Sequence, residues 1–198
     1  MPHLLYLHGF NSSPASIKAR QTAASLAERG LADRFHAPAL PYSPAAAAGL
    51  IAAEIERLGP AGLTVVGSSL GGFYATWAAE RYGCAAVLIN PAVRPHRLLA
   101  PLLGPQRNLY TDQAYVLTER HMDELIALEP AALHPERYWL LAETADETLD
   151  YRDAVAYYAG SRQTVIEGGD HGFQSWQRLL PEVLEHAGLG AADADSIH

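Results

Sequence analysis

Short apolar runs alternate along the chain with longer segments in which apolar residues recur every three or four positions. Unbroken runs are typical of strands buried on both faces of a parallel sheet, and the wider spacing is typical of amphipathic helices. Five runs fit buried strands, at 3–7, 63–66, 84–89, 138–142 and 164–166. A sixth, at 34–40, contains Pro38 and fits an edge strand. The pattern predicts an α/β fold with a mostly parallel sheet of about six strands and helices on both faces.

Helical spacing fills the segments between these runs. Ser13-Pro14 and Ser43-Pro44 place a capping hydroxyl before a proline, a common helix start. A further helix is predicted directly after residue 69, another over 151–158, and a final amphipathic one over 176–187. Pro181 is expected to kink or restart that last helix.

The stretch from residue 90 to residue 136 interrupts the alternation. Only 123–128 has convincing helical spacing there, and the stretch contains six prolines: Pro91, Pro95, Pro101, Pro105, Pro130 and Pro135. Long insertions without a core strand are often functional. We therefore expect a single domain over residues 1–190 with a small cap inserted at about 91–136, and a flexible C-terminal tail at 191–198.

Composition narrows the class of protein. The 198 residues carry a formal net charge of −8, which argues against binding to nucleic acid, because phosphates require a basic face. No apolar run approaches the roughly 20 residues that a membrane span needs, and the N-terminus lacks the basic region of a signal peptide. The single cysteine, Cys84, excludes an internal disulfide. We expect a cytoplasmic protein.

The segment around Ser69 is the clearest chemical signal. Residues 67–71 read Gly-Ser-Ser-Leu-Gly, directly after a β-branched apolar run and before a helical pattern. This is the G-x-S-x-G nucleophile elbow in its expected strand–turn–helix context, in which glycines allow the two backbones to approach closely. Ser69 is therefore the predicted nucleophile. Ser68 is expected to be a turn residue.

A serine nucleophile needs a general base and an acid that orients it. In this architecture the order along the chain is serine, acid, histidine, each in a loop after a later strand. His171 follows the last predicted strand and is the expected base. Asp146 is the preferred acid and Asp150 the alternative, while Asp170 is expected to cap the last helix. His8 is the main alternative as the base. A histidine in this position, directly before the glycine of the first loop, more often shapes the turn that supplies the oxyanion hole.

Two backbone amides are expected to form the oxyanion hole. The amide of Leu70 lies at the predicted helix N-terminus, and the amide of Phe10 lies in the polar loop after the first strand. The remaining histidines show no metal-ligand spacing. We predict no metal and no cofactor.

Five motifs together resemble the YqiA-like small bacterial esterases of the α/β-hydrolase superfamily. They read HGFNSSP at 8–14, GSSLGGFYA at 67–75, NPA at 90–92, DETLDY at 146–151 and GGDHGF at 168–173. The resemblance runs from residue 2 to about residue 189 and implies a cytoplasmic serine esterase or thioesterase without a cofactor. Ala145 stands where the family pattern leads us to expect glycine.

The leading functional hypothesis is a carboxylic ester hydrolase acting on a small-molecule acyl ester through an acyl-enzyme. A thioesterase or acyltransferase with the same triad is the alternative, for which Arg94, Arg97 and Arg107 could meet a phosphate-bearing carrier. A hydrolase-like binding protein is a third possibility. Apolar residues of the cap suggest either an apolar pocket or packing on the main domain: Leu98, Leu99, Leu102, Leu103, Tyr110 and Tyr115.

Overall fold

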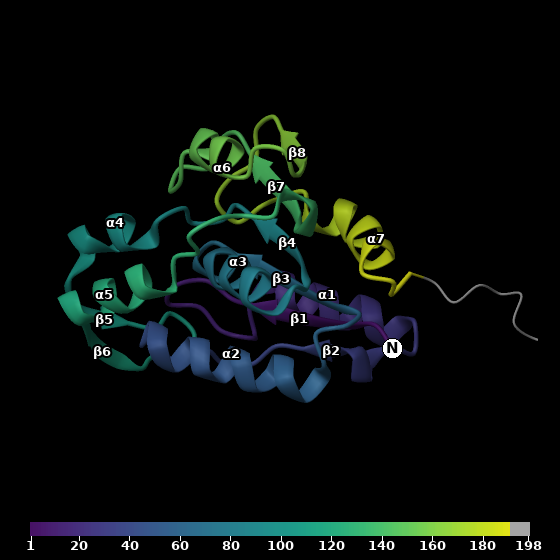
Figure 1. Cartoon of the computed structure of the whole chain (residues 1–198), viewed down its shortest axis with the longest axis horizontal. Coiled ribbons are helices and arrows are strands. Elements are labelled where there is room, and N and C mark those ends of the chain that lie inside the picture. The colour runs from purple at the N-terminus through teal and green to yellow at the C-terminus, as the bar shows by residue number, and fades with distance from the viewer. Residues whose placement is uncertain (191–198) are drawn as a thin grey trace, which may run out of the picture.

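The computed structural model describes residues 1–190 and contains one six-stranded sheet with helices on both faces (Figure 1). The strand order is β2-β1-β3-β4-β7-β8, and every neighbouring pair is parallel. The bounds are β1 His3–Leu7, β2 Phe35–His36, β3 Leu63–Ser68, β4 Ala85–Ile89, β7 Tyr138–Glu143 and β8 Arg162–Ile166. The predicted α/β fold, with six strands, is confirmed.

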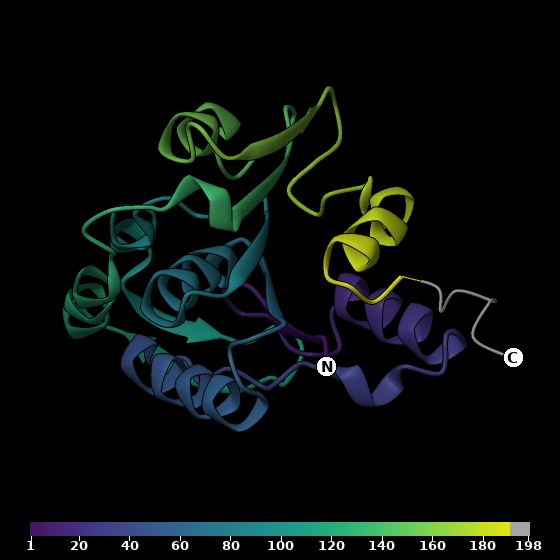
Figure 2. The same ribbon diagram turned by 45° about the vertical axis from the view of Figure 1, so that its right-hand side comes forward.

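The helices divide between the two faces of the sheet. Helices α1 (Ile17–Glu28) and α7 (Trp176–His186) pack side by side on one face, as Figure 2 shows. Helices α2 (Pro44–Leu58), α3 (Leu70–Tyr82) and α6 (Tyr151–Tyr157) contribute to the core on the other face. This two-layer cover buries the sheet on both sides.

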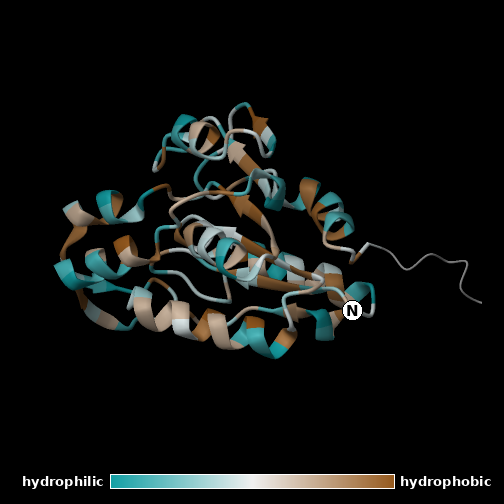
Figure 3. Cartoon of the chain, viewed as in Figure 1, coloured by the Kyte–Doolittle hydropathy of each residue, from teal (hydrophilic) through white to brown (hydrophobic). Residues whose placement is uncertain are grey.

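Strand β1 illustrates why the runs are apolar throughout. Leu4 and Tyr6 join the cluster under α1 and α7, whereas Leu5 and Leu7 join the cluster under α2 and α3. Alternate residues of a strand point to opposite faces, so a strand with a helix on each side must be apolar at every position. Figure 3 shows this as hydrophobic colour along the central strands.

Residues 91–136, named here the cap segment, lie between β4 and β7. They form α4 (Pro95–Leu99), the antiparallel hairpin β5 (Gly104–Arg107) and β6 (Ala114–Leu117), and α5 (Glu119–Leu128). Short 3-10 helices span Ala32–Arg34, Ala100–Leu102 and Pro135–Arg137. In Figure 1 the cap segment lies at the end of the molecule opposite the N-terminus.

Several boundaries differ from the sequence predictions. The first helix begins at Ile17, because the hydroxyl of Ser13 accepts from the amide of Ala15 in a local turn that precedes the helix. The 34–40 run forms only a two-residue strand. Helix α7 continues through Pro181 without restarting. The hairpin of the cap segment was not predicted, and the predicted tail at 191–198 lies outside the described residues.

Candidate active site

Ser69 lies at the tight turn between β3 and α3. Its backbone has φ 56° and ψ −120°, a conformation that costs on the order of 1–3 kcal/mol for a residue with a side chain. A Cβ on Gly67 would overlap the carbonyl of Gly71, and a Cβ on Gly71 would overlap the carbonyl of Leu7. The two glycines therefore let the backbones of β1, β3 and α3 meet beneath Ser69, as an elbow requires.

The structure brings Ser69, His171 and Asp146 together in one hydrogen-bonded chain. The Nε2 atom of His171 lies 3.1 Å from the Oγ of Ser69. Its Nδ1 atom lies 2.8 Å and 3.0 Å from the two carboxylate oxygens of Asp146. In this geometry a proton on Nδ1 is donated to Asp146, which leaves Nε2 free to accept the proton of the serine.

Asp146 is held in place by its own loop. Its Oδ1 atom also accepts hydrogen bonds from the amides of Thr148, at 2.8 Å, and Leu149, at 2.9 Å. Burial alone raises the pKa of this carboxyl, but the hydrogen bonds from His171 and from the two amides outweigh burial and lower the pKa below its usual value. The carboxylate is thus kept ionised beside the imidazole.

The alternative acid, Asp150, lies elsewhere. It is the N-cap of α6, where its Oδ1 accepts from the amide of Arg152 and its Oδ2 pairs with the Arg152 guanidinium. The structure therefore places Asp146, and not Asp150, against His171. Asp170 does not have the capping position expected for it, because the N-cap residue of α7 is Ser175.

The loop that carries His171 is fixed by a buried carboxylate that sequence analysis did not single out. Glu143, at the end of β7, is only 1% exposed and accepts hydrogen bonds from the amides of Asp170, Gln174 and Ser175, at 2.9–3.0 Å. A buried carboxylate is costly unless it is hydrogen-bonded, and here three amides satisfy it. Glu143 holds both ends of the turn that presents the histidine.

Asn90 links the same loop to the centre of the sheet. Its side-chain amide donates to the carbonyl of Asp170, at 3.0 Å, and its Oδ1 accepts from the amide of Glu143, at 3.0 Å. Asn90 follows β4 and is the first residue of the Asn-Pro-Ala motif at 90–92. The sequence signal that Asn90 and Glu143 share is a polar residue directly after an apolar run.

The two predicted oxyanion donors lie next to Ser69. Leu70 is the first residue of α3, so its amide has no partner within the helix. Phe10 follows Gly9, where an added Cβ would lie 3.2 Å from the Cβ of Ser69. The described residues provide no hydrogen-bond acceptor for the amide of either Phe10 or Leu70. Both N–H groups remain available to a ligand.

His8 shapes the loop, and both nitrogens of its ring are hydrogen-bonded to backbone groups. Its Nε2 accepts from the amide of Leu40, at 3.0 Å, so its Nδ1 carries the proton that is donated to the carbonyl of Gly9, at 3.0 Å. Burial lowers the pKa of His8, against the opposing effect of the Gly9 carbonyl. His8 is thus a neutral support for the segment that carries Phe10.

A cavity of about 460 Å³ opens onto Ser69 and His171. Its walls come from the loop after β1, the start of α1, the start of α7, and Leu109 and Tyr110 of the cap segment. The cap segment is tied to the loop after β1, because the hydroxyl of Tyr115 donates to the Oδ1 of Asn11 at 2.7 Å. The cavity is therefore enclosed jointly by the domain and the cap segment.

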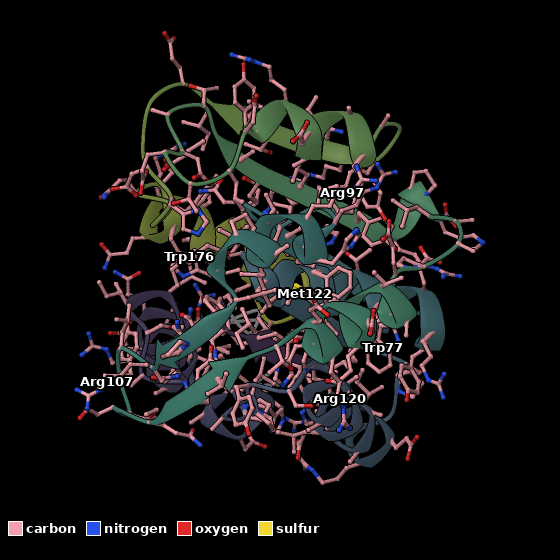
Figure 4. The ribbon with its side chains drawn as sticks, turned by 90° about the vertical axis from the view of Figure 1, so that its left-hand side faces the viewer. Trp77, Arg97, Arg107, Arg120, Met122 and Trp176 are labelled. Atoms are coloured by element: carbon pink, nitrogen blue, oxygen red, sulfur yellow. The ribbon has the colours of Figure 1, made fainter. Side chains whose placement is uncertain are left out.

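Most of the apolar cap residues that were expected to form a pocket do not line this cavity. Of the six predicted, only Tyr110 lines it. Leu98, Leu102 and Leu103 are 40–46% exposed, and Leu99 is buried in the core. Arg94 pairs with Glu129, and Arg107 pairs with Asp112 and points away from the molecule in Figure 4. Neither arginine lies in the wall of the cavity.

Within residues 1–190 no group of three or more histidine, cysteine, aspartate or glutamate side chains is placed to hold a metal ion. None of the helices in that range is both long and apolar enough to cross a membrane.

Comparisons with solved structures identify the same fold. Alpha/beta hydrolase domain-containing protein 10 from mouse is 18% identical, with a TM-score of 0.69 over 94% of this chain and 89% of that one. Est1E from Butyrivibrio proteoclasticus, solved with ferulic acid, is 15% identical, with a TM-score of 0.65 over 96% and 88%. The ydeN gene product of B. subtilis is 11% identical, with a TM-score of 0.67 over 95% and 99%.

At these identities the likeness concerns the fold, which is that of the α/β hydrolases. A family model, described as Uncharacterised protein family (UPF0227), matches residues 3–188 and so covers every strand and helix described above. The chain is a member of the UPF0227 family, and its fold is that of the α/β hydrolases.

Proposed function

We propose that this protein is a serine hydrolase that cleaves carboxylic esters of small molecules through an acyl-enzyme. The observation that carries the proposal is the hydrogen-bonded chain from Ser69 through His171 to Asp146, whose serine and histidine line a cavity. A serine hydroxyl is too weakly acidic to attack a carbonyl efficiently without such a base.

The geometry supports a two-step reaction. In the first step Nε2 of His171 takes the proton of Ser69 as Oγ attacks the acyl carbonyl, and the amides of Phe10 and Leu70 stabilise the oxyanion. The imidazolium then protonates the leaving alcohol. In the second step His171 removes a proton from water, which attacks the acyl carbon and releases the acid and the free serine.

A thioesterase would use the same groups, but a phosphate-bearing carrier would need a cluster of cations beside the cavity, whereas Lys18 is the one lysine or arginine among the described residues that line it. Arg94 and Arg107 are paired with carboxylates and do not line the cavity. A purely binding protein has no need of a base whose two nitrogens lie within hydrogen-bond distance of a serine and a carboxylate. Ester hydrolysis is therefore the function that the site supports best.

The role of Asp146 can be tested against Asp150 in one experiment. We expect the wild type to hydrolyse 4-nitrophenyl esters, and Asp146→Asn to lower kcat by on the order of 10⁴-fold, because an asparagine stabilises the wrong imidazole tautomer. Asp150→Asn removes the same charge four residues away and should retain kcat within about threefold, since Asp150 caps α6.

The wild type and the two variants are compared by their steady-state rates on a series of esters from acetate to a long-chain ester. Circular dichroism verifies that each variant is folded. An equal loss in both variants, or a loss confined to Asp150→Asn, would contradict the assignment. A wild type that is inactive on the whole series would contradict the proposed function itself.

A further inference from the structure

The cavity next to Ser69 has an unusual charge for this protein. The chain carries 22 acidic and 14 basic residues, yet no carboxylate lines the cavity. Apart from His171, the described residues that line it include a single ionisable basic side chain, that of Lys18. Although the protein is acidic, Ser69 and His171 therefore line a cavity in which the charged side chain among the described residues is a lysine.

Lys18 is placed close to the reacting groups. It lies in the first turn of α1, and its Nζ donates to the carbonyl of Gly172, the residue after His171, at 2.8 Å. No carboxylate among the described residues lies within ion-pair distance of it. An ammonium has three donors, and the described chain accepts from only one of them.

Its position in the helix is unfavourable without a ligand. A cation in the first turn opposes the helix dipole, and the first turn of α1 contains no acidic residue to compensate. Burial lowers the pKa of Lys18, against the opposing effects of the carboxylates of Asp170, Glu143 and Asp146. Ser16, the N-cap residue, also lines the cavity, and its side chain makes no capping hydrogen bond to α1. A bound anion would offset these costs together.

The rest of the cavity wall combines polar and apolar side chains. Besides Lys18, it presents side-chain amides and a hydroxyl that can donate and accept hydrogen bonds, from Asn11, Ser12, Gln21, Gln174 and Gln177, beside apolar side chains such as Ile17, Leu109 and Trp176. These polar residues are half-buried or exposed, and those that face solvent would lose hydrogen bonds with water if a long hydrocarbon chain covered them. A substrate that carries polar groups is therefore favoured over a fatty acyl ester.

We infer that Lys18 binds a negatively charged group of the substrate, so that the enzyme prefers small, hydrophilic esters bearing an anion. This inference rests on the proposed ester hydrolysis and adds the class of substrate. Lys18 acts here as a specificity residue: the ammonium contacts the anion while Ser69 attacks the ester carbonyl of the same molecule.

The test compares esters that differ only in charge. The acyl pair is the 4-nitrophenyl ester of hexanoic acid and the 4-nitrophenyl monoester of adipic acid, which share a six-carbon chain. The alcohol pair is phenyl butyrate and 3-carboxyphenyl butyrate. A charged hydrogen bond predicts that the wild type has a kcat/KM roughly 10- to 100-fold higher for the anionic member of at least one pair.

Substitutions then assign the preference to Lys18. Lys18→Met should lower the anionic-to-neutral ratio of kcat/KM by roughly tenfold or more, mainly through KM, whereas Lys18→Arg should keep most of the ratio. Arg20→Met is the matched control, because Arg20 carries the same charge on the same helix but is exposed and lies outside the cavity wall. The ratio in that control should equal the wild-type ratio.

The inference is overturned if the wild type shows no anionic preference in either pair. It is also overturned if Lys18→Met slows both members of a pair equally, since that result would assign Lys18 to holding Gly172. In both cases hydrolysis of the neutral ester by the wild type would leave the proposed function intact. Absence of hydrolysis of any ester would instead contradict the proposed function.

Discussion

Replacing Ser69 with alanine is expected to lower kcat for acyl esters by on the order of 10⁴- to 10⁶-fold. The variant keeps the cavity, the free amides of Phe10 and Leu70 and the His171–Asp146 pair, but residue 69 then has no oxygen with which to form an acyl-enzyme. What remains is the modest acceleration that binding and oxyanion stabilisation can give to attack by water. KM should change far less than kcat, because the serine oxygen contributes little to binding.

Ser68→Ala provides the matched control for this prediction. Ser68 is the adjacent hydroxyl, is 7% exposed and lines the same cavity, but His171 is hydrogen-bonded to Ser69. Its loss should cost less than about tenfold in kcat, in line with the loss of one ordinary hydrogen-bonding group. If Ser68→Ala were the inactive variant and Ser69→Ala retained its rate, the nucleophile would be assigned wrongly.

The second large effect concerns stability and the elbow glycines. Gly71→Ala should lower the free energy of unfolding by about 3 kcal/mol or more, at the upper end of overpacking substitutions. The new methyl group would overlap the carbonyl of Leu7 in β1, and backbone atoms cannot move aside as a side-chain end can. For a domain of this size the midpoint of thermal unfolding should fall by roughly 6–12 °C.

Gly49→Ala is the control for that substitution. Gly49 is an exposed position inside α2, and no atom lies within 4 Å of the place its Cβ would occupy. Alanine is favoured over glycine in a helix by up to about 1 kcal/mol, so this variant should melt slightly above the wild type. The measurement is the midpoint of thermal unfolding of both variants and the wild type under the same conditions. Equal midpoints would contradict the close approach of β1 and α3.

Much of the fold was predictable because burial imposes a simple pattern. Strands β3 and β4 have no solvent-exposed face, since helices cover both sides, and their largely apolar runs are visible in the sequence. Strand β8, at an edge of the sheet, is partly exposed, and only residues 164–166 of Arg162–Ile166 were predicted. Edge strands are less constrained by packing, so the hydrophobic pattern of the sequence marks their ends less clearly.

The hairpin of the cap segment has no such hydrophobic pattern in the sequence. Its strand β5 reads Gly-Pro-Gln-Arg and its exposed positions alternate with half-buried ones, so it lacks an apolar face. The pairing with β6 is fixed by backbone hydrogen bonds and by contacts with the domain. Neither is encoded in hydrophobic periodicity.

The candidate site, like the fold, could be predicted in part. The order of its residues along the chain was informative, whereas the packing of its side chains is visible only in the structure. Parallel strands end at one edge of the sheet, so the loops holding Ser69, Asp146 and His171 could be expected to meet. The distances between those residues agree with that expectation, and their catalytic roles remain predictions. Glu143 and Lys18 could not be selected in this way, because their importance depends on which way a side chain turns.

The most direct test of the central claim is covalent trapping of the nucleophile. The wild type would be treated with a fluorophosphonate, which reacts with activated serines, and its peptides would be analysed by mass spectrometry. We predict one equivalent of label on Ser69, with loss of labelling in Ser69→Ala and strong slowing in His171→Ala. Label on another residue, or a wild type that stays unmodified while folded, would contradict the assignment of Ser69 as an activated nucleophile.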